Sequence, residues 1–174
     1  MFEPEKFHVT ETLQDGSVVE IRAQRPEDKE AILAEVEHAS AETLYHRFFA
    51  VKRRLSEKEE HFFFDVDFVN HVALVAVARD GRDRIIGGCR FIVTGPGKAE
   101  VAFSVADDFQ HHGLGAALMR HITSIARDAG IKEFVAEVLS DNRGMLAVFD
   151  HSGLITTSRR EGTTVHVSMR IPEA

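Results

Sequence analysis

Residues 105–116, VADDFQHHGLGA, carry the clearest chemical pattern in the chain, because an apolar run leads through a glycine-containing turn into a strongly periodic helix. The first four N–H groups of an α-helix lack partners within the helix, and the helix dipole places partial positive charge there. Neither Ser, Thr, Asp nor Asn directly precedes this helix, and Gly113 and Gly115 leave the backbone open to close approach. The segment predicts a binding site for a phosphate-type anion, with a purely structural strand-to-helix turn as the alternative.

Two common phosphate-binding loops do not fit this segment. A Walker loop ends in Gly-Lys-Ser/Thr, whereas residues 114–116 read Leu-Gly-Ala and supply neither a lysine nor a hydroxyl. A dinucleotide-binding fingerprint needs a third glycine, and Leu118 occupies that position. The sequence therefore argues against ATP binding through a Walker loop and against dinucleotide binding.

Hydrophobic periodicity predicts the elements that hold this turn in place. Leu114, Leu118, Ile122 and Ile125 recur at helical spacing, and Gly130 follows where a left-handed C-terminal cap is expected. The predicted strands are residues 17–23, 71–78, 84–94, 98–106, 132–139, 154–158 and 163–171, and the predicted helices are residues 28–40, 43–51, 61–68, 114–129 and 142–152.

The order of these elements predicts an α+β fold (mixed α/β), in which a central mixed, mostly antiparallel β-sheet is flanked by helices. Short turns join three consecutive strands, whereas the helix of residues 114–129 joins two strands by a crossover. No linker composition interrupts the chain, so we expect a single domain over residues 1–174, with residues 1–16 as a polar N-terminal lead.

Two helix caps are also predicted from local spacing. Ser56 and Glu59 have the spacing of a capping box ahead of the helix of residues 61–68. Asn142 is expected to cap the last helix through the N–H of Met145.

Composition narrows the class of protein. The 174 residues are 44% hydrophobic and 28% charged, as in ordinary globular domains, and the formal net charge of −7 argues against a nucleic-acid partner. One cysteine excludes a disulfide framework and a cysteine-based zinc site. The start of the chain contains no long apolar run, so we expect a cytoplasmic protein with no membrane partner.

The turn at Gln110, His111, His112, Gly113, Leu114 and Gly115 resembles the Q/RxxGxG/A signature of the GNAT superfamily of N-acetyltransferases, and the order of elements resembles that family's fold. The resemblance implies acetyl-CoA as co-substrate, with the pyrophosphate on the N–H groups of the loop and the pantetheine arm along the preceding strand. It implies that the cofactor-binding residues are Phe103, Ser104, Val105, Gln110, His111, His112, Gly113, Leu114, Gly115, Ala116, Asn142 and Phe149.

The chain is more specifically similar to the GNAT domains of bacterial Pat-type protein lysine acetyltransferases. The residues that carry this similarity are 25–28, 40–49, 98–103 and 141–145. Such domains often adjoin a cyclic-nucleotide-binding domain or an acyl-CoA synthetase, for which this chain is too short. The similarity implies acetyl transfer to a primary amine, on a small molecule or a protein lysine, by direct attack in a ternary complex.

Glu100 is the candidate catalytic residue, because the Pat-type domains use a glutamate at the matching position as general base. A lysine amine has a pKa of about 10.4 in water and must lose a proton before it attacks. Glu100 stands among Val101, Ala102 and Phe103, so we expect partial burial to raise its pKa. The alternative is an exposed glutamate beside Lys98 with no catalytic role.

One position departs from the family pattern. Many GNAT enzymes carry a tyrosine four residues before the glycine that ends the later helix, as an acid for the departing thiolate, and here Phe149 stands four residues before Gly153. The departure motivates a second hypothesis, in which the chain is a catalytically idle acyl-CoA sensor or interaction module.

The remaining reactive or charged residues have structural interpretations. His111 and His112 lack the further ligands that a metal site needs, so we expect no metal. Cys89 is expected to be a buried, inert thiol. The aromatic run at residues 62–64 and the open sheet edges fit either a homodimer or ordinary core packing. A local basic patch comprises Arg47, Lys52, Arg53 and Arg54. We expect it either to lie on a solvated face or to attract an acidic acceptor or the adenosine 3′-phosphate.

Overall fold

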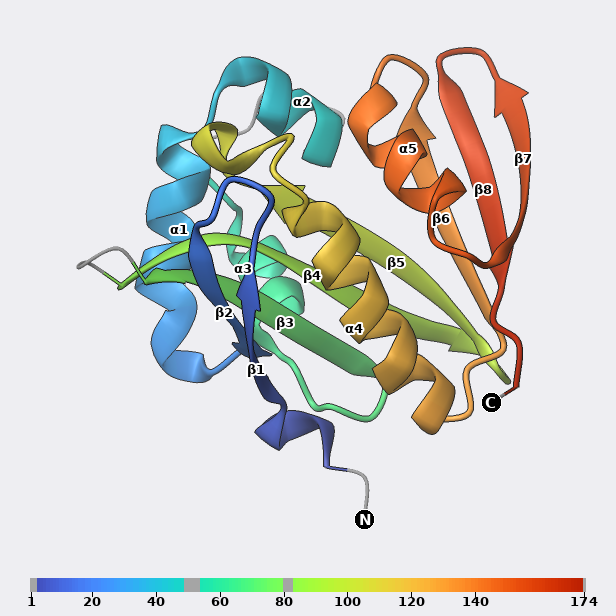
Figure 1. Ribbon diagram of the computed structural model, residues 1–174, viewed down its shortest axis with the longest axis horizontal. Helices are drawn as coiled ribbons and strands as arrows, with labels where there is room; N and C mark the ends of the chain where they lie inside the picture. Colours follow the sequence, from blue (N-terminus) through green and yellow to red (C-terminus); the bar gives the residue numbers. More distant parts are fainter. Residues whose placement is uncertain (1–2, 49–53, 80–82, 174) are drawn as a thin grey trace.

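The computed structural model describes residues 3–48, 54–79 and 83–173, which form one eight-stranded sheet with helices on both faces (Figure 1). The order across the sheet is β1-β2-β3-β4-β5-β6-β8-β7, and all neighbours are antiparallel except β5 and β6, which are parallel. The prediction of a mixed, mostly antiparallel sheet is confirmed. The strands are β1 (His8–Thr12), β2 (Val18–Ala23), β3 (His71–Arg79), β4 (Asp83–Gly95), β5 (Lys98–Val105), β6 (Glu133–Leu139), β7 (Ile155–Glu161) and β8 (Thr164–Arg170).

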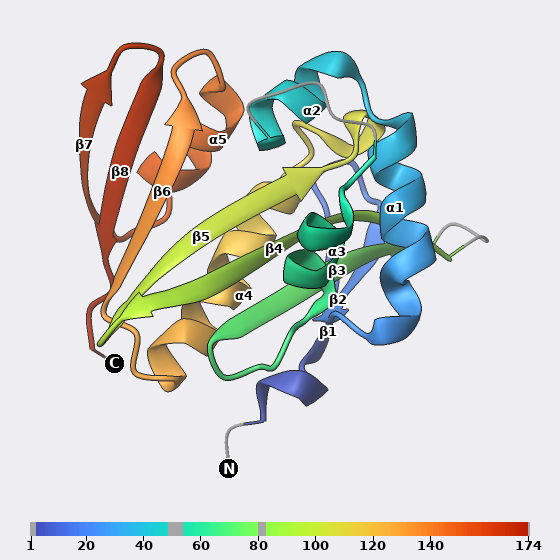
Figure 2. The ribbon, with the colours of Figure 1, turned by 180° about the vertical axis from the view of Figure 1, so that it is seen from behind.

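The helices divide between the two faces of the sheet. The α-helices of the described residues are α1 (Lys29–His38), α2 (Ala41–Phe48), α3 (Glu57–Phe64), α4 (Leu114–Asp128) and α5 (Arg143–Asp150). In Figure 1, α4 and α5 lie in front of the sheet. Figure 2 shows the opposite face, which α1 and α3 cover, with α2 near the end of β5.

Helix α4 is the main hydrophobic contact of the front face. The predicted stripe is confirmed, because Leu114, Leu118 and Ile122 are almost fully buried in the core cluster that also contains Phe91 and Phe134. Full burial of a leucine or isoleucine side chain stabilises a fold by about 1.5–3 kcal/mol. This packing fixes the position of the helix N-terminus relative to β5.

Three boundaries differ from the sequence-based prediction. The polar lead contains the unpredicted strand β1, which pairs with β2; its residues are exposed or half-buried, so it lacks the apolar run that marks a strand. Helix α3 occupies residues 57–64 rather than 61–68, because the predicted capping box of Ser56 and Glu59 is formed and starts the helix at Glu57. Helix α2 begins at Ala41, two residues before the predicted start, and the predicted residues 49–51 lie outside the described residues.

Strands β5 and β6 pair over only three positions, and this short pairing opens the sheet. Lys98, Ala99 and Glu100 oppose Glu133, Phe134 and Val135, and beyond them the two strands diverge (Figure 1). Residues 101–105 of β5 therefore expose one backbone edge to the gap. Such an unpaired edge is available to hydrogen-bond an extended ligand.

The predicted burial of Cys89 is confirmed: its Sγ lies 3.9 Å from the Leu118 carbonyl oxygen, and burial raises the pKa of the thiol. Within the described part of the chain, no helix has the length and apolar content needed to cross a membrane.

Candidate functional site

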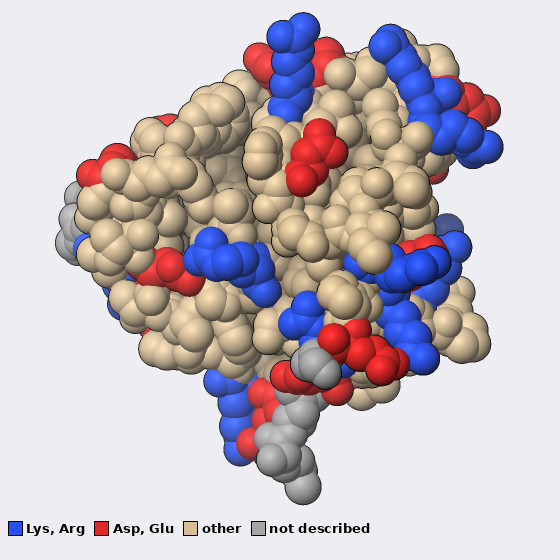
Figure 3. Space-filling model, turned by 45° about the vertical axis from the view of Figure 1, so that its right-hand side comes forward, with Lys and Arg blue, Asp and Glu red and all other residues tan. Residues whose placement is uncertain are grey.

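A groove of about 620 Å³ occupies the gap between the diverging strands, with walls from α2, β5, the loop before α4, β6 and α5. Figure 3 shows this side of the molecule, where a hollow between two lobes is bordered mainly by residues other than Lys, Arg, Asp and Glu. Of the predicted catalytic and cofactor-binding residues, the groove wall includes Glu100, Phe103, Ser104, Val105, Gln110, His111, Gly113, Leu114, Gly115, Ala116, Asn142 and Phe149. The structure thus brings all of them except His112 to one surface.

The N-terminus of α4 opens into this groove without a side-chain cap. Its N-cap residue is Gly113, none of the side chains that the structure describes accepts a hydrogen bond from the first turn, and the first turn contains no acidic residue. The N–H groups of that turn and the positive end of the helix dipole therefore face the groove, which is the arrangement that binds phosphate groups.

Glycine is required at positions 113 and 115 for two different structural reasons. Gly113 has φ of +90°, a left-handed conformation that other residues adopt at a cost. Gly115 has ordinary helical geometry, but a Cβ atom there would lie 3.1 Å from Cγ2 of Val148 on α5. Close packing of α4 on α5 thus accounts for Gly115, so the structural alternative explains part of the glycine pattern.

The Gln110 side chain ties the loop to α2 and β5. Its Nε2 donates to Thr43 Oγ1 at 2.9 Å and to the carbonyl oxygen of Val105 at 3.1 Å. Thr43 Oγ1 in turn donates to Asp107 at 2.5 Å, and Asp107 also accepts from the backbone N–H and the hydroxyl of Ser40. Partial burial tends to raise the pKa of Asp107, but these hydrogen bonds outweigh it and lower the pKa below its usual value.

The two loop histidines point in different directions. His111 is exposed and lines the groove. His112 lies outside it, because its Nδ1 is 3.3 Å from Asp15 Oδ2 in the β1–β2 turn and its ring packs on Phe109. The structure therefore does not place the His112 side chain with the other predicted cofactor-binding residues. Among the described residues, no three His, Cys, Asp or Glu side chains come together in a way that could hold a metal ion.

Glu100 lies where the pairing of β5 with β6 ends, and its side chain is exposed. The expected partial burial is wrong, because Ala99, Val101 and Phe103 face the core under α4 while Glu100 faces the other side. Arg47 is the cation that interacts with Glu100. Burial lowers the pKa of the Arg47 guanidinium, and the Glu100 carboxylate opposes that shift because it favours the charged form of Arg47.

The last helix of the groove wall is capped as predicted. Asn142 Oδ1 accepts a hydrogen bond from the Met145 N–H at 3.2 Å. Phe149 is 1% exposed, and its ring packs against Phe103 with the centroids 5.8 Å apart. The position where the family pattern implies a tyrosine thus holds a ring that belongs to the core and offers no hydroxyl to the groove.

A second group of polar residues behind α2 was missed by the sequence analysis. Arg90 is 6% exposed and lies within hydrogen-bond distance of His71, Gln24 and the Phe63 carbonyl oxygen. The available signal was a single arginine inside the apolar strand GGCRFIV. Of the predicted basic patch, Arg47 is half-buried rather than on a solvated face, Arg54 is exposed, and Lys52 and Arg53 lie outside the described residues.

Comparison with known proteins adds a family context to this geometry. Residues 34–154 match the model described as Acetyltransferase (GNAT) family. An acetyltransferase from Pseudomonas aeruginosa is 34% identical over 140 residues, covering 79% of this chain and 75% of that protein. Acetyltransferase Pat of Mycolicibacterium smegmatis is 33% identical over 145 residues, covering 82% of this chain. The match covers 43% of Pat, so this chain spans less than half of that relative's length.

The similarity to a GNAT domain of known structure extends over the whole fold. The crystal structure of the GNAT domain of PAT from S. lividans is 35% identical in sequence and superposes with a TM-score of 0.84. The similarity covers 94% of this chain and 96% of that domain, so it extends over the groove, the loop and the helices on both faces.

Proposed function

Because the chain belongs to the GNAT family of acyl-CoA-dependent N-acetyltransferases, we propose that it transfers an acetyl group from acetyl-CoA to a primary amine by direct attack within a ternary complex. The acceptor amine is carried by a small molecule or by a protein lysine. The observation that carries the proposal is the uncapped N-terminus of α4, which opens into a groove beside an unpaired strand edge.

The groove residues fit a coenzyme A thioester. The diphosphate would lie on the N–H groups at the start of α4, where Gly113 and Leu114 begin the helix without a cap. The pantetheine arm would hydrogen-bond the free edge of β5 at residues 103–105, as an added strand does. The thioester supplies an activated acyl group, and the chain supplies its orientation.

Glu100 is the proposed general base. The acceptor reaches the groove as an ammonium ion, and Glu100 accepts its proton, directly or through one water molecule, so that the nitrogen lone pair becomes available. Its exposed position at the start of the gap gives a proton on the carboxylate a route to solvent. Because a free thiol has a pKa of about 8.5, the leaving group needs no dedicated acid near neutral pH, which agrees with Phe149 in place of a tyrosine.

The proposal is tested by measuring binding and turnover on the same preparation. Calorimetric titration with acetyl-CoA reports binding, and release of the free thiol in the presence of an amine panel reports transfer. We expect binding in the micromolar range, as is common for enzyme substrates, and thiol release that depends on the amine. Absence of acetyl-CoA binding would refute the assignment of the groove.

Phe149 favours one alternative function. A chain that binds acyl-CoA without turning it over would act as a sensor or docking module, and the missing hydroxyl is the observation that motivates this reading. Tight acetyl-CoA binding without amine-dependent thiol release, across small amines and lysine peptides, would support the sensor over the enzyme.

A further inference from the structure

A second cavity, of about 390 Å³, lies behind α2, between α1–α3 and strands β3–β5. It adjoins the groove, because Thr43, Arg47, Phe48 and residues 102–105 line both. A molecule in this cavity would therefore meet the groove beside the edge of β5. The volume lies within the range of small-molecule binding sites, roughly 300–1,000 Å³.

Arg90 places a buried positive charge on the wall of this cavity. Nη1 donates to the Phe63 carbonyl oxygen at 2.8 Å and lies 2.9 Å from His71 Nε2, and Nη2 donates to Gln24 Oε1 at 3.0 Å. Burial and the nearby guanidinium lower the pKa of His71 to about 4, so the imidazole is neutral at pH 7 and accepts from Arg90. None of these three partners is an anion, and a buried charge without a counter-ion is costly.

Arg47 adds a second positive charge to the same wall. Its guanidinium carbon lies 5.8 Å from the centre of the Phe63 ring, and that of Arg90 lies 3.5 Å from it, so the two cations share one aromatic neighbour. Burial, and to a smaller extent repulsion by the charge of Arg47, lowers the pKa of Arg90 to about 9. Arg47 has no ion pair within 4.0 Å to any side chain that the structure describes.

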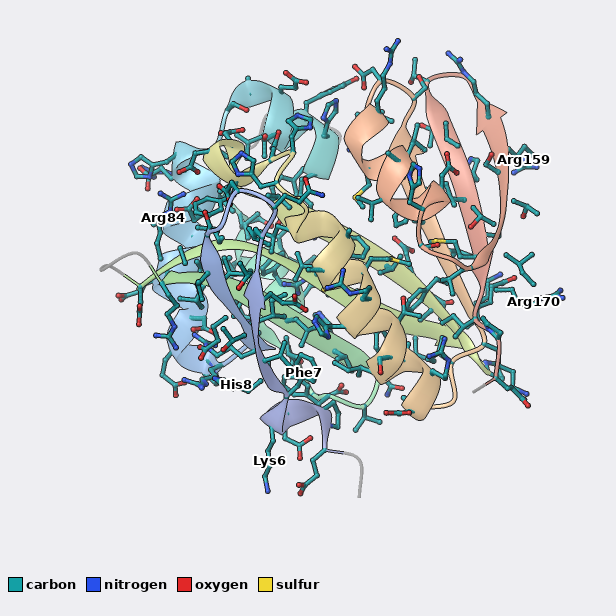
Figure 4. The ribbon with its side chains drawn as sticks, in the orientation of Figure 1. Lys6, Phe7, His8, Arg84, Arg159 and Arg170 are labelled. Carbon is teal, nitrogen blue, oxygen red and sulfur yellow. The ribbon has the colours of Figure 1, made fainter. Side chains whose placement is uncertain are left out.

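The carboxylates that line the cavity are engaged elsewhere. Glu35 lies 3.3 Å from Arg84, which also reaches Asp108 at 2.6 Å; Figure 4 labels Arg84 at the far left of the fold. Asp107 accepts hydrogen bonds from Ser40 and Thr43. The wall formed by Arg47 and Arg90 thus has an excess of positive charge.

We propose that this cavity holds the acceptor substrate, and that the acceptor is a small amine bearing a carboxylate, which Arg47 and Arg90 bind while its ammonium group lies toward Glu100 and the edge of β5. The inference rests on the proposed transferase function and names its substrate class. Charge complementarity is the reason: the acceptor's anion supplies the counter-ion that Arg90 lacks and adds a second anion beside Arg47, which interacts only with the exposed Glu100 carboxylate among the described carboxylates. The acceptor's cation lies beside that Glu100 carboxylate.

The test compares each amino acid with the amine obtained by removing its carboxylate. Lysine is paired with 1,5-diaminopentane and ornithine with 1,4-diaminobutane, at saturating acetyl-CoA, with thiol release as the readout. We expect kcat/KM to be roughly ten- to a hundredfold higher for the amino acid of each pair, the usual effect of a charge-assisted hydrogen bond. A pair of lysine peptides, one with glutamate beside the lysine and one with glutamine, separates a free amino acid from an acidic protein segment.

Variants connect this preference to the cavity. Arg47→Gln should abolish the preference for the carboxylate by raising KM more than it lowers kcat, and Arg47→Lys should retain part of it. Arg159→Gln is the control, because Arg159 lies on β7, far from the cavity at the right-hand edge in Figure 4, and is 77% exposed. Arg90 is left intact because its buried hydrogen bonds also support the fold.

The outcomes separate the inference from the function on which it rests. Equal kcat/KM values within each pair would overturn the inference and leave the transferase function standing. A preference for the carboxylate only in peptides would also overturn it, in favour of an acidic protein segment. If no amine is acetylated, the transferase function fails, and calorimetric titration with lysine then decides: binding that Arg47→Gln removes supports a carboxylate site, and absence of binding overturns it.

Discussion

The side-chain amide of Gln110 donates a hydrogen bond to the hydroxyl of Thr43, although 67 positions separate the two residues in the chain. Gln110 belongs to the loop that opens α4, and Thr43 belongs to α2, whose residues line both the groove and the cavity behind it. The same hydroxyl donates to Asp107. The loop before α4 and the helix beside the proposed acceptor cavity thus share one hydroxyl group, and Ser40 adds two further hydrogen bonds to Asp107.

Replacing Thr43 by valine should weaken both sites together. The change keeps the shape of the side chain but removes two hydrogen bonds, which contribute about 0.5–1.5 kcal/mol each to stability. We expect the free energy of unfolding to fall by about 1–3 kcal/mol, acetyl-CoA binding to weaken and the KM for the amine to rise, measured by denaturation, calorimetry and steady-state kinetics. Thr43→Ser keeps the hydroxyl and is the control; equal defects in Ser and Val variants would contradict this role.

Replacing Gly115 by alanine should weaken acetyl-CoA binding by displacing α4 from α5, because the added Cβ would lie 3.1 Å from Val148 Cγ2. Overpacking of this kind costs about 1–3 kcal/mol. The double variant Gly115→Ala with Val148→Ala removes the contact and should restore most of the affinity, measured by calorimetry. If the double variant binds as weakly as the single one, Gly115 is needed for the approach of the ligand itself rather than for packing.

Replacing Glu100 by glutamine should lower kcat by about 10²–10⁴-fold, the usual contribution of a general base, and leave acetyl-CoA affinity within about twofold. The exposed position of Glu100 makes a folding defect unexpected, because the substitution removes no described ion pair or side-chain hydrogen bond. Glu133→Gln, on the neighbouring strand, is a matched control, since it changes a carboxylate outside the groove wall. Turnover close to that of the unmodified chain would exclude Glu100 as the base.

The buried contact between His71 and Arg90 predicts a loss of stability in mild acid. The pKa of His71 is lowered to about 4 by burial and by Arg90, whereas in the unfolded chain it is about 6.5. Between these values the unfolded state binds the proton and the folded state does not, so the stability present above pH 6.5 falls as the pH drops toward 4. The full difference corresponds to about 3 kcal/mol.

Urea unfolding at pH 7 and pH 4.5 measures this effect. The variant His71→Gln keeps an acceptor for Arg90 but does not titrate, so its stability should change less between the two pH values. An identical pH dependence in the variant and the unmodified chain would show that other groups cause the loss.

Local sequence patterns were sufficient to predict the elements whose apolar side chains recur at regular spacing on one buried face. The stripe of Leu114, Leu118 and Ile122 predicted α4, and the absence of a capping side chain before it predicted the open N-terminus, because both depend on residues within a few positions of each other. Strand β1 was missed for the same reason, since its alternating exposed and half-buried residues carry no apolar run, and pairing with β2 alone defines it.

Which side chains share one surface was decided by contacts between distant parts of the chain. Residue spacing did not show that Glu100 faces away from the core, that His112 turns to Asp15, or that Arg90 lies among Gln24, Phe63 and His71. These outcomes depend on the divergence of β5 from β6 and on the packing of α1–α3 against the sheet. Sequence alone determined the sheet class, the family signature and the uncapped start of α4. The charge of the proposed acceptor site emerged only when folding brought separate strands and helices together.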